Sequence, residues 1–341
     1  MAHHHHHHMA QREVSDQPIT LTQDDVILVT GGTGLFGKAV EHIVKKEQIK
    51  GKWVFLGSKD GDLRDADACK QPFEKYRPTY VIHLAAFVGG LFKNMNFKVS
   101  FWLDNVNMNN NILTCCYDFG VKKTISCLST CVFPDKIEYP ITEEKLHEGP
   151  PHFSNNAYAY AKRMLDMLGR WYNEKAVNEG KSCLFTSVIP TNLFGPHDNF
   201  NVEAGHVLPG LMHKCYKAQQ NGTDFVVFGS GKPLRQFLYS HDAARMLLWT
   251  MFNYQSEEPI MLCVSEEDEK SIGQVAQTIK DAFNFTGNMV FDTSKADGQY
   301  KKTSSNAKFL RLNPTFQYTP FEQAIKETVQ WFLENYETAR K

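Results

Sequence analysis

Short apolar runs alternate with longer amphipathic stretches over most of this chain. The runs are rich in β-branched and apolar residues, as buried strands are, and they cover residues 26–30, 53–56, 80–84, 124–128 and 184–189. Stretches of helical length fill the intervals, and the two longest, 97–119 and 157–177, carry apolar residues on more than one face. Because such alternation requires parallel strands joined by crossover helices, it predicts an α/β fold with a doubly wound, Rossmann-type parallel sheet.

The regular alternation loosens after residue 190, where a second, smaller α/β lobe is expected to begin. The chain is then expected to return to the first domain before it completes the small lobe. The predicted Rossmann domain comprises residues 24–190 with 236–264, and the predicted small lobe comprises residues 191–235 and 265–341. Residues 1–8 contain six consecutive histidines and are identified as an expression tag.

The composition narrows the range of partners. The formal net charge is −1, which argues against nucleic acid or an anionic membrane surface, because both usually need a strong basic excess. A small-molecule partner is expected instead. Eight cysteines stand at irregular spacings with no secretory signal peptide, so we expect a reduced, cytoplasmic protein. Cys127 and Cys131 alone are too few ligands for a zinc site, and no metal is predicted.

A glycine-rich loop joins the first expected strand to the helix that follows it. Gly32, Gly34 and Gly37 match the G-x-G-x-x-G pattern in that context. Glycine allows a tight turn and close backbone approach to a phosphate, and the helix N-terminus offers unpaired N–H groups. The pattern predicts a dinucleotide site that includes Gly31, Gly32, Thr33, Gly34, Leu35, Phe36 and Gly37.

The residues after the second expected strand indicate which dinucleotide binds. NAD-binding proteins tend to place an acid there, against the ribose hydroxyls. This chain has Ser58 and Lys59, and a hydroxyl with an ammonium favours the 2′-phosphate of NADPH. Asp60 and Asp62 lie close enough to leave NAD open, and a solvated surface role is equally open for Lys59. Adenine and nicotinamide-ribose contacts are expected from Asp62, Leu63, Leu84, Ala85 and Ala86.

A tyrosine and a lysine four residues apart suggest hydride-transfer chemistry. Tyr158 and Lys162 fall on one face of an expected helix, so the ammonium can lie beside the phenol. A phenol with a pKa near about 10 is a poor acid–base catalyst at neutral pH, and an adjacent cation is expected to lower that pKa. Ser129 ends an expected buried strand, at the sheet edge where open α/β folds bind ligands. The three side chains are therefore expected to converge.

These residues carry a family resemblance. The glycine loop, His83-Leu84-Ala85-Ala86, Ser129 and the Tyr-x-x-x-Lys pattern resemble the extended short-chain dehydrogenase/reductase superfamily. Longer strings are similar to the GDP-L-fucose synthase family within it, namely Val88-Gly89-Gly90-Leu91 and residues 129–134, 190–200 and 205–209. The resemblance implies a homodimer that converts GDP-4-keto-6-deoxy-D-mannose to GDP-L-fucose, by epimerising C3 and C5 and then reducing C4 with NADPH.

The resemblance also implies which residues epimerise the sugar, assigning the acid and base to Cys131 and His206. A thiol of pKa near about 8.5 is partly ionised at neutral pH, and an imidazole near about 6.5 exchanges protons readily. Ser129 and Tyr158 can hydrogen-bond the developing oxyanion. The residues alone favour Cys131 as a small buried hydrophobe and His206 as a residue at a helix start.

Further contacts follow from the same resemblance. Cofactor contacts are implied for Pro190, Thr191, Asn192, Leu193 and His206, and substrate contacts for Lys214, Phe228, Arg235 and Asp297. The guanidinium fork of Arg235 suits a diphosphate. A member of this family has tryptophan at the position of Phe228. Phe228 can therefore stack or pack, but it has no indole N–H to donate. For all four substrate residues the alternative is a solvated charge or a core aromatic.

Two other functions remain open from the sequence. A nucleotide-sugar 4-epimerase of the same fold would keep NAD bound and return the hydride to the sugar. A cofactor-sensing protein would bind NADP without turnover, since a fold does not fix a function. The set of Ser129, Tyr158 and Lys162 favours an enzyme.

Overall fold

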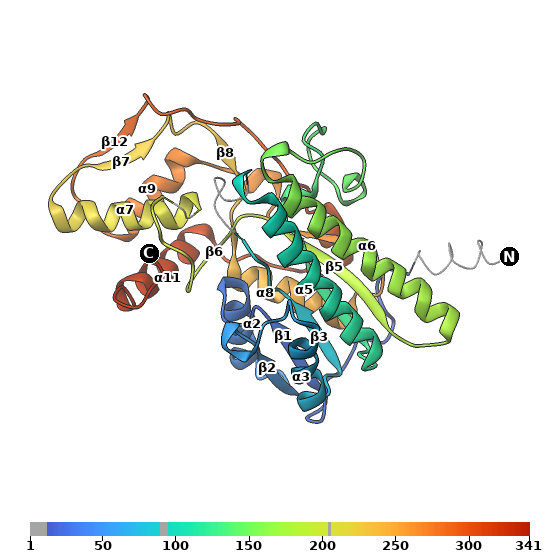
Figure 1. The fold of residues 1–341 in the computed structure, drawn as a ribbon. Coiled ribbons are helices and arrows are strands. Elements are labelled where there is room, and N and C mark those ends of the chain that lie inside the picture. Colours follow the sequence, from blue (N-terminus) through green and yellow to red (C-terminus); the bar gives the residue numbers. More distant parts are fainter. Residues whose placement is uncertain (1–11, 89–94, 204–205) are drawn as a thin grey trace.

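A six-stranded parallel sheet forms the centre of the computed structural model, which describes residues 12–88, 95–203 and 206–341 (Figure 1). The strand order is β10-β5-β4-β3-β1-β2, and every neighbouring pair is parallel. The strands are β1 (Val26–Thr30), β2 (Lys52–Phe55), β3 (Tyr80–His83), β4 (Lys123–Cys127), β5 (Leu184–Pro190) and β10 (Ile260–Leu262). The predicted Rossmann-type α/β fold is confirmed, and the five expected strands all form.

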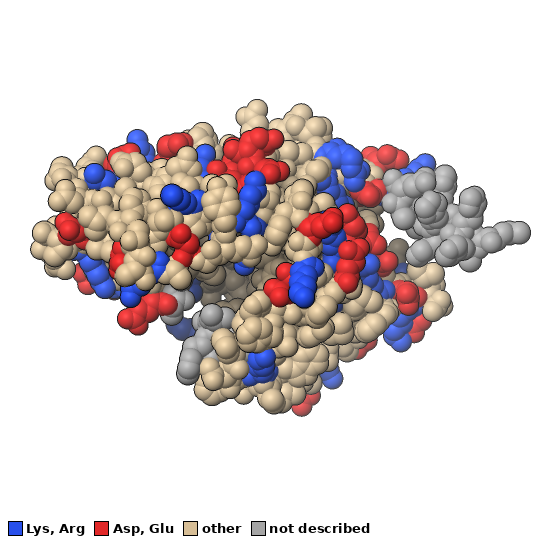
Figure 2. All heavy atoms as spheres, turned by 90° about the horizontal axis from the view of Figure 1, so that it is seen from above, with Lys and Arg blue, Asp and Glu red and all other residues tan. Residues whose placement is uncertain are grey.

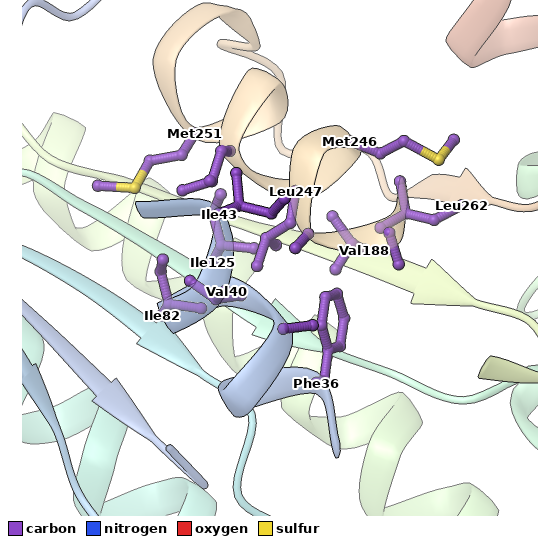
Figure 3. Packing of buried hydrophobic residues seen from close by; sticks show 14 of the residues in the cluster. Phe36, Val40, Ile43, Ile82, Ile125, Val188, Met246, Leu247, Met251 and Leu262 are labelled. Atoms are coloured by element: carbon purple, nitrogen blue, oxygen red, sulfur yellow. The ribbon is translucent and has the colours of Figure 1, made fainter. Parts of the chain in front are cut away.

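Helices cover both faces of this sheet (Figure 1). One face carries α2 (Leu35–Lys46) and α8 (Ser240–Asn253), and the other carries α3 (Ala66–Tyr76), α5 (Lys98–Asp118) and α6 (Asn156–Glu179). Successive strand residues point to opposite faces, so Ile27 and Val29 enter one core cluster and Leu28 the other. Figure 3 shows the first cluster, in which α2 and α8 pack side chains on the sheet.

The direction in which successive strands are added to the sheet reverses beside β1. Strand β2 pairs on one side of β1 and β3 on the other, which creates a topological switch point. In open α/β sheets, ligands bind in the crevice outside the carboxyl ends of the strands at such a point. The glycine-rich loop follows β1, and the Leu84-Ala85-Ala86 segment follows β3, so the topology brings these two segments together.

A third core cluster holds the smaller lobe together. Its helices are α7 (Val207–Asn221), α9 (Ile272–Ala282) and α11 (Phe321–Glu334). Short strand pairs complete it: β7 (Phe225–Phe228) with β12 (Met289–Asp292), β8 (Leu234–Arg235) with β11 (Lys270–Ser271), and β6 (Leu193–Phe194) with β9 (Leu238–Tyr239). Helix α10 (Ala307–Leu312), in the segment assigned to this lobe, packs on β10, and Phe309 enters the first core cluster. The domain boundaries stay a prediction.

Single-turn 3-10 helices lie in the connections between the larger elements. They are η1 (Ser58–Asp60), η2 (Thr130–Val132), η3 (Glu143–Lys145), η4 (Phe153–Asn155) and η5 (Glu266–Asp268). Basic and acidic residues are intermixed on the face seen in Figure 2. Among the described helices, none combines the length and apolar character needed to cross a membrane.

Candidate active site

The glycine-rich loop packs so closely that three of its glycines have no room for a side chain. Gly31 has φ +64°, and a Cβ there would lie 2.7 Å from the Ala85 nitrogen. A Cβ on Gly32 would lie 2.7 Å from Cβ of Phe55, and one on Gly37 would lie 2.6 Å from Cα of Gly32. These glycines allow the loop to pack against β2, β3 and the start of α2.

Gly34 differs from the other three. A Cβ there would meet only the Gly31 oxygen, at 3.5 Å, and the backbone angles of −81° and −177° suit any residue. Gly34 immediately precedes α2, where the first N–H groups of a helix lack intrahelical partners. The space above Gly34 therefore lets an anionic group approach the backbone at a helix N-terminus.

The expected 2′-phosphate residues follow β2. Ser58 and Lys59 lie in η1, and both are exposed. The Asp60 carboxylate accepts a hydrogen bond of 2.7 Å from the Gly57 N–H, so one candidate acid is occupied in holding this turn. Lys59 forms no ion pair within the described part of the chain. The exposed Lys59 ammonium thus lies at this turn, where a contact with the 2′-phosphate was expected.

Asp62 and Leu63 accept hydrogen bonds from Arg64 and Asn111, two residues that were not predicted from the sequence. Arg64 donates 3.0 Å hydrogen bonds to both carboxylate oxygens of Asp62 and a 3.1 Å bond to Asp104 on α5. The Arg64 guanidinium holds the pKa of Asp62 below its ordinary value. The Asn111 amide donates to the backbone oxygens of Leu63 and Arg64. The segment is thus attached to α5.

The loop after β3 is fixed by a buried hydrogen-bond chain. Asn109 Oδ1 accepts from His83 Nε2 at 2.8 Å, which leaves His83 Nδ1 to accept from the Thr30 hydroxyl at 2.6 Å. Thr30 Oγ1 in turn accepts from the Ala85 N–H at 3.1 Å. Burial lowers the pKa of His83 to about 4, so its imidazole is neutral. His83 therefore orders the Leu84-Ala85 backbone beside Gly31.

A pair of asparagines on α5 was not singled out by sequence reasoning. The Asn105 amide accepts from the Phe87 N–H and donates to the Phe87 oxygen, both at 2.9 Å. Asn109 lies four residues further along the same helix, and both asparagines are buried. Two polar residues four positions apart on an otherwise apolar helix face could have identified this pair from the sequence, because buried amides need hydrogen-bond partners.

Four expected catalytic side chains gather at the carboxyl end of β4. Ser129 precedes η2, which carries Cys131, and the two side chains are hydrogen-bonded. Helix α6 packs on η2 and brings Tyr158 and Lys162. Lys162 Nζ donates to the Cys127 oxygen at 2.7 Å and lies 5.8 Å from the centre of the Tyr158 ring.

Two expected protonation states are wrong. Burial, with the nearby thiols of Cys131 and Cys127, raises the pKa of Tyr158 well above its ordinary value, whereas a lowered value was expected. Burial also raises the pKa of Cys131, although its Ser129 hydrogen bond and the charge of Lys162 act in the opposite direction. For Cys131, desolvation penalises the thiolate more than the neighbouring cations favour it. Tyr158 is therefore a neutral phenol at neutral pH, and Cys131 is mainly a thiol.

A cleft of about 690 Å³ opens beside these residues. Ser129 and Cys131 line it from the β4 side, and His206, the exposed residue that precedes α7, lines it from the small lobe. The segment that follows β5 forms a third wall, where the Asn192 amide donates to the Gln236 oxygen at 2.9 Å. The expected cofactor residues Thr191, Asn192 and Leu193 line this wall, and Pro190 ends β5 directly before it.

A second cleft of about 310 Å³ contains all four expected substrate residues, and His206 and Arg235 line both clefts. Lys214 Nζ lies 3.4 Å from the centre of the half-exposed Phe228 ring. Asp297 accepts 2.7 Å hydrogen bonds from the N–H and hydroxyl of Ser230. Burial lowers the pKa of Arg235, and the guanidinium forms no ion pair within the described residues. The two clefts therefore adjoin at His206 and Arg235, with Ser129 in one and Phe228 in the other.

Comparison with known proteins places this site in a family. The sequence pattern of the NAD dependent epimerase/dehydratase family matches residues 27–263. The chain belongs to this family. Among its members the chain is similar to the GDP-L-fucose synthase of Dictyostelium discoideum, with 55% identity over 94% of this chain and 99% of the relative. The probable GDP-L-fucose synthase of Drosophila melanogaster is 49% identical over 92% of this chain and 99% of the relative.

Solved structures are also similar to this member of the NAD dependent epimerase/dehydratase family. A crystal structure of a GDP-L-fucose synthetase from Naegleria fowleri is 98% identical, with a TM-score of 0.94 over 97% of this chain and 100% of that chain. Another crystal structure of that protein, bound to NADP, has a TM-score of 0.93 over 96% of this chain and 100% of that chain. The resemblance to GDP-L-fucose synthases expected from the sequence is confirmed.

The structure describes only part of two sequence segments that resemble the family. Gly89, Gly90 and Leu91 lie outside the described residues, as do Gly205 and the tag. Val88, at the start of the first segment, is exposed. Among the described residues of this epimerase-family chain, no group of three or more His, Cys, Asp or Glu side chains is arranged to hold a metal ion.

Proposed function

We propose that this protein is an NADPH-dependent epimerase and reductase that converts GDP-4-keto-6-deoxy-D-mannose to GDP-L-fucose. The similarity to GDP-L-fucose synthases over nearly the whole chain supports the reaction. The observation that carries the proposal is that the two clefts adjoin, since His206 and Arg235 line both the cleft with Ser129 and Cys131 and the cleft with Lys214 and Asp297. A nucleotide sugar fits two adjoining clefts, with its sugar in one and its nucleoside in the other.

NADPH is the proposed cofactor, held at the switch point beside β1. The 98% identical crystal structure bound to NADP supports this choice. The open space above Gly34 suits the diphosphate, and exposed Ser58 and Lys59 suit the 2′-phosphate. When bound, the cofactor supplies a hydride for the C4 carbon of the keto-sugar.

Tyr158 is proposed to donate the proton to the C4 oxygen as the hydride arrives. Its raised pKa keeps the phenol protonated at neutral pH, which is the form that a proton donor in a reduction needs. Ser129 hydrogen-bonds the C4 oxygen and polarises the carbonyl. Lys162, which donates to the Cys127 oxygen, holds the nicotinamide ribose and supplies positive charge beside the phenolate that forms.

Cys131 and His206 are proposed to exchange the protons at C3 and C5 before reduction. They line the same cleft from different elements, η2 and the start of α7, so they can approach a sugar ring from two sides. Protons beside the C4 ketone are acidic because Ser129 and Tyr158 can hydrogen-bond the enolate oxygen. One residue removes a proton and the other returns one on the opposite face.

The small lobe is proposed to hold the GDP moiety. The Arg235 guanidinium forms no ion pair among the described residues and lines both clefts, which supports its proposed role in binding the diphosphate. Phe228, with Lys214 over its ring, offers a flat surface for a base. Asp297, held by Ser230, offers a carboxylate to ribose or base N–H and O–H groups.

The protein is also proposed to be a homodimer through α5 and α6. These helices share an exposed apolar groove lined by Val99, Trp102, Leu103, Tyr160 and Met164, here called the α5/α6 groove. Leu103 is 47% exposed and Val99 72% exposed, which is unusual for adjacent turns of a helix in a monomer. A second copy presents the same apolar helices, and an isologous contact buries both grooves at once.

Turnover with the keto-sugar tests the proposal. Purified protein incubated with GDP-4-keto-6-deoxy-D-mannose and NADPH should consume one NADPH for each sugar, and NMR should identify GDP-L-fucose. A 4-epimerase would isomerise its sugar with no net loss of NADPH. A cofactor-sensing protein would bind NADPH without turnover. Either result would overturn the proposed function.

A further inference from the structure

The turn that carries Cys131 has little to hold it in place by itself. Turn η2 spans three residues, and its own backbone bonds run from Val132 N–H to the Ser129 oxygen and from Phe133 N–H to the Thr130 oxygen, at 3.1 and 3.2 Å. A 3-10 turn of this length has poor hydrogen-bond geometry. The position of the Cys131 thiol therefore depends on contacts from other elements.

Arg163 on α6 supplies those contacts. Its side chain is buried, with Nε donating to the Val132 oxygen and Nη2 donating to the Gly149 oxygen, both at 2.6 Å. The rigid guanidinium fork thus joins η2 to the loop at Gly149, which is itself tied to the cleft wall by a 2.9 Å bond from the Asp135 N–H to the Pro150 oxygen. One side chain fixes two loops that border the cleft.

The charge of Arg163 is not neutralised by an acid. Arg163 forms no ion pair within the described residues, and its other contact is the Tyr160 ring, 5.4 Å from the guanidinium carbon. Burial lowers the pKa of Arg163, yet a guanidinium stays protonated in proteins. A buried cation without an acidic partner is costly. A packing role alone does not require that charge, because apolar side chains fill such a space at lower cost.

Cys131 is one of the groups that gain from this charge, together with the Tyr160 phenol. The positive charge of Arg163 favours the Cys131 thiolate, as do Lys162 and the Ser129 hydrogen bond, against the opposing effect of burial. Tyr158 also faces this thiol. The remaining titratable side chains around the cleft are Asp135, Tyr139, His152, His206, Arg235 and Lys302.

We propose that Arg163 is a positioning residue for Cys131, which holds the η2 turn in place and brings positive charge near the thiol. This role rests on the proposed epimerisation by Cys131. Both Lys162 and its neighbour Arg163 favour the thiolate, but of the two it is Arg163 that is hydrogen-bonded to the η2 turn.

Two substitutions separate charge from geometry. Arg163→Met removes both the charge and the fork, whereas Arg163→Lys keeps the charge and loses the double contact. The matched control is Arg170→Met, on the same helix, where the arginine pairs with Asp166 and Glu258 instead of with η2. Circular dichroism and NADPH binding by fluorescence show whether each variant is folded and has an intact cofactor site.

The first readout needs no substrate. The rate at which iodoacetamide alkylates Cys131, followed by peptide mass spectrometry across pH, reports the pKa of that thiol. Arg163→Met should shift this profile upward by about half a pH unit or more, and Arg163→Lys by less. The Arg170→Met profile should match that of the unmodified protein.

The second readout follows deuterium entering C3 and C5 of GDP-4-keto-6-deoxy-D-mannose in deuterated water without NADPH. Arg163→Met should lower this exchange at least about tenfold because the thiol is displaced and less ionised, and Arg163→Lys should recover part of it. A folded Arg163→Met protein with an unchanged alkylation profile and unchanged exchange would overturn the inference. If the unmodified protein exchanges nothing, the proposed function fails, and the alkylation profile still decides the role of Arg163.

Discussion

At the scale of single residues, burial decides the protonation states in this site. Tyr158 and Lys162 lie four residues apart on α6, as expected, but the Lys162 ammonium donates a hydrogen bond to the Cys127 oxygen. The pKa of Tyr158 is raised, so the phenol is held as an acid. Sequence reasoning identified the residue types and their spacing. It could not give the direction of the pKa shifts, because the desolvating groups come from α6, β4 and η2 together.

The first prediction concerns Tyr158. Tyr158→Phe should fold and bind NADPH normally, since the ring is kept, while steady-state NADPH oxidation with the keto-sugar falls by about 10²–10⁴ because the proton donor is lost. Deuterium exchange at C3 and C5 without NADPH should be largely retained. Undiminished NADPH oxidation by this variant would remove Tyr158 from the mechanism.

The second prediction concerns pH and Cys131. If the thiolate removes the sugar proton, its raised pKa means that only a small fraction is ionised at neutral pH, and that fraction grows about tenfold per pH unit. Deuterium exchange should therefore rise steadily from about pH 6.5 to about pH 8.5, roughly tenfold per unit at first. An exchange rate that is level across this range would exclude the Cys131 thiolate as the base.

Substitutions check the same assignment. Cys131→Ala and His206→Ala should both lose exchange at C3 and C5 while they retain NADPH binding. Cys183→Ala is the matched control and should exchange normally, because that thiol is only partly buried and lies outside both clefts. Normal exchange in a folded Cys131→Ala protein would show that this thiol only packs.

At the scale of elements, buried strands and long helices could be predicted closely. The expected strand at 26–30 coincides with β1, and the expected helix at 157–177 lies within α6. Continuous apolar runs specify such elements locally. The two-residue strands β6 and β8 could not be predicted, because they exist only through pairing with distant segments. The attachment of the cofactor loops to α5 likewise depends on contacts across the fold.

The third prediction separates two roles of glycine in the loop after β1. Gly37→Ala should destabilise the protein by about 1–3 kcal/mol, because its methyl group meets backbone atoms that cannot move aside easily. Gly34→Ala should leave the melting temperature nearly unchanged, since the backbone angles and the space both accept a methyl group. It should nevertheless weaken NADPH binding, measured by fluorescence titration. Equal NADPH affinity in Gly34→Ala and the unmodified protein would place the diphosphate elsewhere.

At the scale of the whole molecule, the cleft is built from segments that lie far apart in the chain. Its walls come from η2, the segment after β5, the start of α7 and the β8 region. Individual substrate residues such as Lys214 and Asp297 were predicted from the family resemblance. Their arrangement in one cleft could not be predicted from spacing, because it depends on how the small lobe packs.

The fourth prediction concerns assembly. Leu103→Glu places a charge in the α5/α6 groove and should convert a dimer to a monomer, as measured by analytical ultracentrifugation, because burying an unpaired carboxylate is costly. Val290→Glu, at a partly exposed apolar position on β12, is the matched control and should leave the assembly unchanged. A dimer that persists in Leu103→Glu would place the interface on another surface.

Helix α5 serves two purposes on different sides. Val99 and Leu103 line its outer groove, whereas Asp104, Asn105 and Asn111 hold the loops of the cofactor site. If a second copy covers this groove as proposed, a contact that stiffens α5 would also act on these loops, and linkage would make the effect reciprocal. Diluting the protein through its dissociation range should weaken apparent NADPH affinity, and saturating NADPH should tighten self-association by the same factor. Cofactor occupancy would then follow the concentration of this chain.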